Sequence, residues 1–149
     1  MTTYKGIIAI SRNTTSETTV NMMRQFVGRV DKQMLFQFRE VKLTPKELKI
    51  LEYLRCGDNV QPKELSRNLV LESYEISRAL KNMKGQGIIN MANRPGSKKD
   101  KLVALTPKGL LLAKEVCRKA RNLHENALHN LNDSEYKILN TLLGKIFLP

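Results

Sequence analysis

Apolar residues recur every three or four positions along most of this 149-residue chain, the spacing that puts them on one face of an α-helix. The first such run covers residues 17–42 and predicts a helix of about six turns. Its apolar positions are Val20, Met23, Val27, Val30, Met34, Phe38 and Val41. A small domain does not easily bury so long a seam. We therefore interpret it as a surface shared with a second copy of the chain, in preference to a stripe facing the core of one copy.

A second helix has a complete start signal after this seam. Thr44 is a good N-cap, Pro45 suits the first turn, and Glu47 can close a capping box. The predicted inner face consists of Leu48, Leu51 and Leu54, and residues 56–59 stop the helix. A third helix follows from Gln61, which is a poorer cap.

Residues 65–83 have the pattern of two short packed helices joined by a turn. The inward positions are Leu65, Leu69, Ile76, Leu80 and Met83, with a break at residues 71–73. We expect Ser73 to cap the second of these helices. Its outward face then carries Tyr74, Glu75, Ser77, Arg78 and Lys81 near the N-terminal end.

A β-hairpin with a basic tip is predicted next. Gly85 and Gly87 end the preceding helix, residues 88–93 and 102–105 have strand character, and residues 94–101 form a turn. The cations of this turn are Arg94, Lys98, Lys99 and Lys101. A polar-faced helix beside a basic hairpin is typical of proteins that place the helix in the major groove of DNA and the hairpin on the backbone or minor groove.

The rest of the chain predicts two more helices. Thr106 and Pro107 start one whose apolar stripe continues from Leu110 to Leu131. A second capping box at residues 131–136 opens a final helix with Leu139, Leu142, Leu143 and Ile146 on one face. The expected fold is therefore mainly α, with four helices, one hairpin and two helices in a single domain. Residues 1–16 are an extension with a short apolar run and no assigned role.

Charge adds to this picture. The chain carries 26 Lys and Arg against 14 Asp and Glu, a net charge of +12, with a pI of about 9.9. Residues 61–109 hold ten of the basic and four of the acidic residues, a net +6 on a third of the chain. Half of the surplus therefore lies on the helix-turn-helix and hairpin. Charge alone fits any polyanion, so DNA, RNA and acidic membranes stay open on this evidence.

Other function classes find little support in the sequence. No apolar run approaches the ~20 residues of a membrane span, and we expect a cytoplasmic protein without a secretion signal. Cys56 and Cys117 are then free thiols, interpreted as inert because neither has clustered charges nearby that would lower a thiol pKa. His124 and His129 are five positions apart, which does not suit a metal site on one helical face. No catalytic or cofactor motif stands out, so we expect neither an enzyme nor a cofactor.

Five short segments, in this order and at this spacing, resemble the MarR family of winged helix-turn-helix transcription factors over about residues 17–147. They are Leu43-Thr44 with Ile50-Leu51 and Leu54, Glu64-Leu65-Ser66, Ile76-Ser77-Arg78-Ala79-Leu80-Lys81, Gly87-Ile88-Ile89, and Leu105-Thr106-Pro107-Lys108-Gly109. The resemblance implies a homodimer formed by the terminal helices, a reading helix in each major groove, and a hairpin, the wing, near the adjacent minor groove.

The resemblance also implies site residues and a division of the chain. Dimerisation helices would occupy residues 17–42 and 110–149, and a DNA-binding winged helix-turn-helix residues 43–109, within one domain at residues 1–149. The expected DNA contacts are Tyr74, Glu75, Ser77, Arg78, Lys81, Arg94, Lys98, Lys99 and Lys101. The family wing has an Asp-x-Arg pattern, and here Ser97 and Lys99 stand at the equivalent positions, so the usual wing contact of the family is in doubt.

We therefore expect a homodimeric, sequence-specific regulator of transcription, a repressor that binds a palindromic site on double-stranded DNA. The alternative is a winged-helix module whose outer face binds a partner protein, since one fold can serve both uses. A small-molecule effector would lie between the reading part and the terminal helices, but no residue set in the sequence names one.

Overall fold

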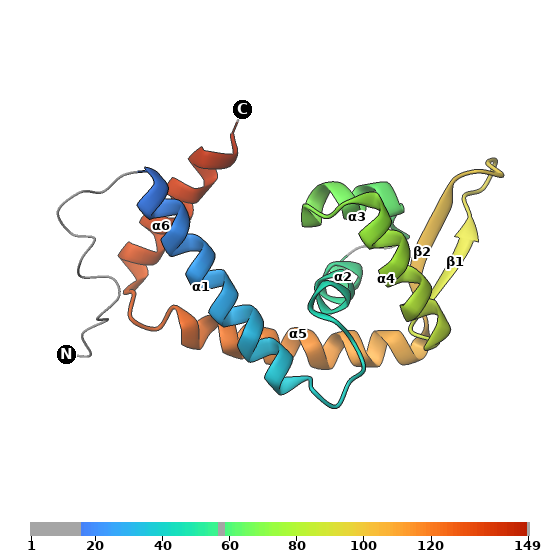
Figure 1. Cartoon of the computed structure of the whole chain (residues 1–149), viewed down its shortest axis with the longest axis horizontal. Coiled ribbons are helices and arrows are strands. Elements are labelled where there is room, and N and C mark those ends of the chain that lie inside the picture. The colour runs from blue at the N-terminus through green and yellow to red at the C-terminus, as the bar shows by residue number, and fades with distance from the viewer. Residues whose placement is uncertain (1–15, 57–58, 149) are drawn as a thin grey trace.

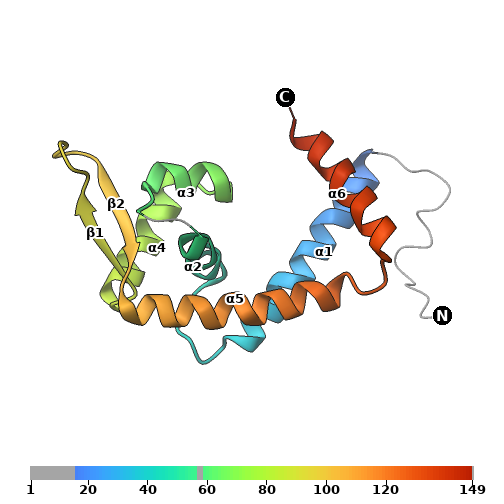
Figure 2. The same cartoon turned by 180° about the vertical axis from the view of Figure 1, so that it is seen from behind.

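The computed structural model describes residues 16–56 and 59–148, so the predicted extension before residue 16 lies outside it. The elements are α1 (Ser16–Gln37), α2 (Pro45–Cys56), α3 (Pro62–Leu69), α4 (Ser73–Gly85), β1 (Ile89–Asn93), β2 (Lys101–Leu105), α5 (Pro107–Ala127) and α6 (Asp133–Phe147). This is the predicted order. Figures 1 and 2 show an elongated molecule with two parts. One part holds α2, α3, α4 and the hairpin, the other holds α1 and α6, and the long helix α5 extends from the first part to the second.

The core lies where α2, α3, α4 and the hairpin pack against α5, and it extends to Met34 and Phe38 at the end of α1. The predicted inner positions of α2, Leu48, Leu51 and Leu54, are each at most 3% exposed. Ile50 is also fully buried, because α2 is covered on more than one side, by α3, α4 and α5. The α2 capping box is confirmed: the Glu47 N–H donates to Thr44 Oγ1 over 3.2 Å, and the Thr44 N–H donates to Glu47 Oε2 over 3.0 Å.

The helix-turn-helix is confirmed, with a correction at its turn. Ser73 is the first helical residue of α4, and Glu72 takes the N-cap position. The Ile76 N–H donates to the Glu72 carbonyl over 3.1 Å, and the Glu72 N–H donates to Glu75 Oε2 over 2.9 Å. The prediction of Ser73 as cap was wrong because a glutamate can reach the free N–H of the residue three positions before it.

The hairpin is a two-stranded antiparallel sheet in which Ile89 pairs with Leu105 and Asn93 with Lys101. Val60 adds a single bridge to Val103, with N–H to carbonyl distances of 3.0 and 2.8 Å, which the sequence did not indicate. This bridge ties the start of α3 to the base of the wing, so the wing is anchored to the helix-turn-helix.

The terminal helices end earlier than the apolar pattern predicted. α1 stops at Gln37, so Phe38 and Val41 follow it in a turn, where Phe38 is nevertheless buried at 3% exposure. α5 stops at Ala127, and its stripe continues to Leu131 only in sequence. Periodicity overran α1 because an apolar residue in a turn, here Phe38, can reach the same core as one on the helix. Leu131, which follows α5, is 36% exposed and does not join the core. The α6 capping box between Asn132 and Glu135 is confirmed, with both bonds at 2.9 Å.

Two of the terminal helices leave their apolar faces largely uncovered within the described chain. In α1 only Met34 is buried, and in α6 no side chain is. The large apolar side chains with at least 40% exposure on these helices are Val20, Phe26, Val27, Phe36, Tyr136, Ile138, Leu142, Ile146 and Phe147.

The start of α5 approaches the link between α4 and β1 closely. A Cβ at Gly109 would lie 1.9 Å from the Ile88 carbonyl oxygen, and that carbonyl also accepts a bond from the Thr106 N–H at 3.0 Å. Thr106 caps α5 as predicted, since its Oγ1 accepts from the Gly109 N–H at 3.0 Å. Glycine is therefore required here for close approach.

We predict that Gly109→Ala lowers the free energy of unfolding by about 1–3 kcal/mol, because the added methyl group must displace backbone. Gly85→Ala is the matched control, since nothing lies within 4 Å of a Cβ at that position and its backbone angle suits alanine. Urea unfolding of both variants measures the difference. An equal loss at the two positions would contradict the packing argument.

Candidate nucleic-acid interface

The outward face of α4 carries polar and cationic side chains, as predicted. Tyr74 is 66% exposed, and Ser77, Arg78 and Lys81 are exposed beside it. The opposite face of α4 packs into the core through Ile76, Ala79, Leu80 and Met83. None of the ion pairs found among residues 16–56 and 59–148 involves Arg78 or Lys81. Both cations are therefore open to a ligand.

Glu75 differs from the other predicted residues of this face. Its Oε1 pairs with Lys46 Nζ from the first turn of α2, and its Oε2 accepts the Glu72 N–H at 2.9 Å. The hydrogen bond from Lys46 and the one from the Glu72 backbone lower the pKa of the Glu75 carboxyl. Both of its oxygens are thus engaged within the protein, and the side chain joins α2 to the start of α4.

A second carboxylate fixes the same two helices and was identified from sequence only as part of a cap. Glu47 is 3% exposed, and its Oε1 accepts a 2.7 Å bond from Asn82 Nδ2 in the last turn of α4. Further along, Gln86 Nε2 donates to the Lys42 carbonyl at 3.0 Å. The segment at the start of α2 therefore holds α4 at three points along its length. The sequence carried no signal for these contacts, because the partners are 29 to 44 residues apart.

The wing loop is organised by Ser97. Its Oγ accepts from the N–H groups of Lys99 at 3.3 Å and Asp100 at 3.1 Å, and its own N–H donates to the Arg94 carbonyl at 3.0 Å. Gly96 has a φ of +83°, which suits glycine in this turn. Serine thus orders the loop at the position where the family pattern has an acid.

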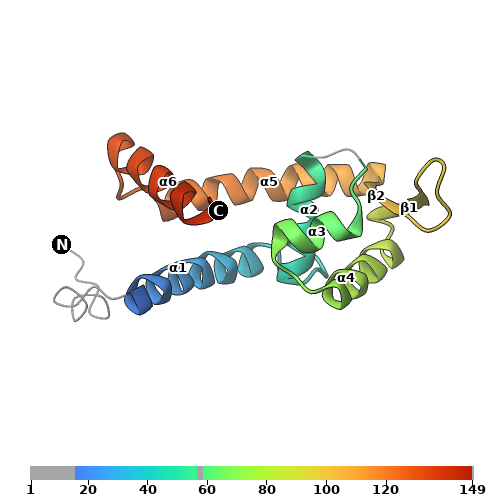
Figure 3. The same ribbon diagram turned by 90° about the horizontal axis from the view of Figure 1, so that it is seen from above.

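The four predicted wing cations, Arg94, Lys98, Lys99 and Lys101, are all exposed. Figures 1 and 3 show that the hairpin lies beside α4 at the end of the molecule remote from α1 and α6. The structure therefore brings the predicted residues of α4 and the wing to one end of the molecule, with Glu75 withdrawn into an ion pair.

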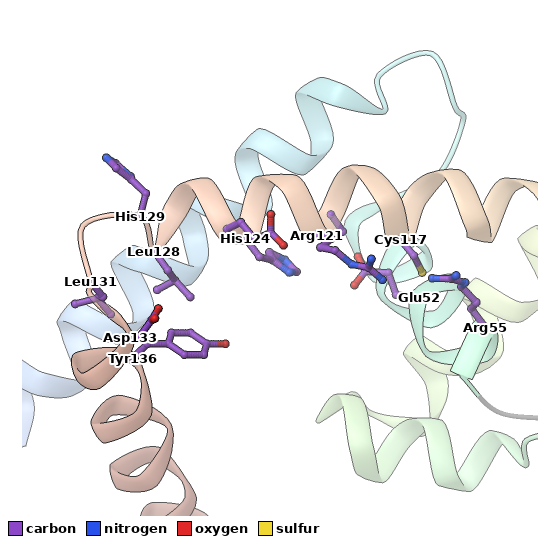
Figure 4. A pocket seen from close by; sticks show the side chains of 12 residues that line it. Glu52, Arg55, Cys117, Arg121, His124, Leu128, His129, Leu131, Asp133 and Tyr136 are labelled. Carbon is purple, nitrogen blue, oxygen red and sulfur yellow. The ribbon is translucent and has the colours of Figure 1, made fainter.

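A hollow of about 700 Å³ lies between α2, α5 and the start of α6. Figure 4 shows its lining, which includes Glu52, Arg55, Cys117, Arg121, His124 and Tyr136. Burial raises the pKa of Glu52, against the opposing charges of His124 and Lys49. Arg55 and Arg121 line this hollow together with Cys117, a grouping that the sequence did not reveal. Among residues 16–56 and 59–148, no three His, Cys, Asp or Glu side chains are placed to hold a metal ion.

No helix in the part of the chain that the structure describes is long and apolar enough to cross a membrane.

Residues 43–109, which run from the start of α2 into the first turn of α5, match the family model of a winged helix DNA-binding domain. Together with the fold, this match defines a winged-helix DNA-binding protein. Over 106 residues the chain is 32% identical to the multiple antibiotic resistance protein MarR of Salmonella typhimurium, covering 70% of this chain and 73% of that one. MarR of Escherichia coli K12 is 28% identical over the same length. The chain belongs to the MarR family of transcriptional regulators, which is not an enzyme class.

Solved structures show the same fold. A MarR-family regulator of Listeria monocytogenes, crystallised with a 26-mer DNA, has a TM-score of 0.81 at 23% identity and 85% coverage of both chains. A cysteine-to-serine mutant of Escherichia coli MarR with operator DNA has a TM-score of 0.76 at 21% identity, covering 99% of this chain and 100% of that one. The regulator SlyA gives 0.81 at 20% identity, with 86% and 90% covered.

We predict that Glu75→Gln lowers the thermal midpoint at neutral pH, because the charge that pairs with Lys46 is lost. The folded-state pKa lies below the usual value of 4.5, so this stabilisation is complete above pH 4.5 and is lost as the pH falls through the folded value. The midpoints of wild type and variant should therefore converge as the pH falls below 4.5. The control is Glu40→Gln, an exposed carboxylate on the turn after α1. A gap that stays constant from neutral to acid pH would contradict the ion pair.

Proposed function

We propose that this protein is a homodimer that binds double-stranded DNA at an inverted-repeat operator and represses transcription from it, which would place it with its DNA in the cytoplasm. The observation that carries the proposal is the outward face of α4, where Arg78 and Lys81 have no acidic partner among the described residues, beside the exposed cations of the wing. Two regulators of the same fold have been crystallised with DNA, which supports this use of the fold.

In this proposal α4 reads bases in the major groove. Arg78 can make two parallel hydrogen bonds to a guanine edge, and Ser77 can bond to any base. Tyr74 and Lys81 extend the contact along the groove. Glu75 orients α4 through Lys46, since both of its oxygens are already bonded. Its predicted contact with DNA is therefore replaced in our proposal by a positioning role.

The wing supplies contacts that carry little sequence information. Lysine carries a compact and strongly hydrated charge. Its desolvation on entering a narrow minor groove therefore costs more free energy than the desolvation of arginine. Lys98 and Lys99 are exposed on the loop ordered by Ser97, and we assign them to backbone phosphate, with Arg94 and Lys101 flanking them.

A second copy of the chain is the proposed cover for the terminal helices, at residues 17–42 and 110–149. Leu142 and Ile146 are 52% and 61% exposed on α6, and Val27 is 49% exposed on α1, although all three lie on the apolar faces that the sequence pattern predicts. Burying such a face against a copy of itself gives two-fold symmetry. The half-sites of the operator should then lie about one helical turn, ~10 bp, apart.

The direct test of the function is a gel shift with the DNA upstream of the protein's own gene, with coding-sequence DNA of equal length as control, followed by a reporter fused to the shifted promoter. A retarded band only with the upstream DNA, and a fall in reporter output on expression of the protein, are expected. Equal or no retardation of both DNAs would refute sequence-specific binding and favour a protein-interaction module. A rise in reporter output would refute repression alone.

We predict that Leu142→Glu with Ile146→Glu converts the dimer to a monomer, because two buried charges at the interface cost more than the apolar contact gains. Lys63→Glu with Arg67→Glu is the matched control, because these exposed positions on α3 have the same four-residue spacing and lie outside both proposed dimerisation segments. Sedimentation velocity at micromolar concentration measures the mass. Wild type that sediments as a monomer, or dissociation in the control pair, would overturn the assigned interface.

We predict that Arg78→Ala weakens binding to the operator by about 1–3 kcal/mol and relaxes preference at one base position per half-site. In contrast, Lys98→Ala with Lys99→Ala should weaken binding to all DNA about equally and flatten the dependence of log K on log salt by roughly 0.9 per lost contact. Fluorescence anisotropy with operator and random duplexes separates the two effects. Equal losses on both duplexes for Arg78→Ala would show a phosphate contact instead.

A further inference from the structure

Val70, in the turn between α3 and α4, combines two unfavourable features. Its backbone is left-handed, with a φ of 54° and a ψ of 49°, a region that β-branched residues avoid because Cβ crowds the backbone. Its side chain is 89% exposed, more than any other large apolar side chain that the structure describes. The other non-glycine residue with positive φ in the described chain is Asn59, a type that tolerates this conformation.

The fold requires the left-handed backbone at this position but not the valine. The Val70 N–H donates to the Ser66 carbonyl, and the Leu71 N–H donates to the same carbonyl at 3.1 Å. Ser66 Oγ in turn donates to the Leu71 carbonyl. These bonds end α3 and would form equally with glycine or asparagine at position 70. Packing does not explain the side chain either, because water surrounds it.

The position of Val70 points to a ligand. It lies three residues before the first residue of α4, at the end of the helix whose first outward residues are Tyr74 and Ser77. In helix-turn-helix proteins this N-terminal end of the second helix faces the base edges. In Figure 3 the turn between α3 and α4 lies near the middle of the molecule, between the wing at one end and α1 and α6 at the other, so Val70 is outside the proposed dimer surface on α1 and α6.

We propose that Val70 is a specificity-determining residue that packs against the C5-methyl group of a thymine in the major groove. This inference rests on the proposed function and names one feature of the operator. A thymine methyl is the apolar group that the major groove offers, and it distinguishes thymine from the other three bases. A strained backbone held at a functional site explains why a residue costly to the free protein stands there.

The test uses an operator selected from a random duplex library by the wild-type protein. Each thymine is replaced in turn by deoxyuridine, which removes only the methyl group. Wild type should lose affinity about four-fold for each contacted methyl, the value for one buried methyl-sized group, at one thymine per half-site. Val70→Gly should bind the thymine and uracil duplexes equally, whereas Val70→Ile should keep the preference.

Stability supplies a second readout. Val70→Gly and Val70→Asn should each raise the thermal midpoint of the free protein, because both residues accept the left-handed backbone more readily than valine does. A lower midpoint for both variants would overturn the strain argument. An operator that wild type binds with no uracil-sensitive position, or a thymine preference that survives in Val70→Gly, would overturn the inference while leaving the proposed function intact. Failure of wild type to select any DNA would refute the proposed function itself, and this inference with it.

Discussion

The buried carboxylate of Glu47 is the contact that fixes the position of α4, whose outward face we propose to read DNA. It closes the first turn of α2 through Thr44 and receives a bond from Asn82 of α4, so one side chain both starts a helix and orients another. A carboxylate that is 3% exposed must be bonded, since leaving it without donors would be strongly destabilising. That requirement restricts the angle between α2 and α4 to values at which the bond from Asn82 to Glu47 can form. Lys46 with Glu75 and Lys42 with Gln86 reinforce it on either side.

The same arrangement explains how a basic surface remains available. Within the winged helix, Glu75 is bonded to Lys46 and Glu64 Oε1 accepts from the Tyr53 hydroxyl at 2.9 Å. The carboxylates of Glu64 and Glu75 are thus directed at neighbours within the winged helix. Arg78, Lys81 and the wing lysines meet no acidic partner in the described chain. Residues 61–109 carry a net charge of +6, and these cations lie on the outer surface of α4 and the wing. This surface therefore suits a polyanion.

α5 connects the winged-helix part of the molecule to the terminal helices. Its first turn is locked to Ile88 by the Gly109 approach and the Thr106 cap, and its second half contacts α1. The spacing of two reading helices in a dimer would then be set by a helix rather than by a flexible linker. The hollow lined by Arg55, Cys117 and Arg121 lies along this connection.

The sequence by itself determined the element order, the caps at Thr44, Thr106 and Asn132, and the outward position of Arg78. Each of these features depends on residues that lie within one or two helical turns of each other. It also carried enough of the family's short motifs to identify the fold. Only the tertiary structure decided that Glu75 serves Lys46, that Glu47 reaches Asn82, that Ser97 orders the wing, and that α1 and α5 stop short of their apolar stripes. Periodicity specifies which face of a helix turns inward but not where the chain leaves the helix. Hydrogen-bond partners 29 and 35 residues apart are selected by the packing of α2 against α4, which local patterns do not encode.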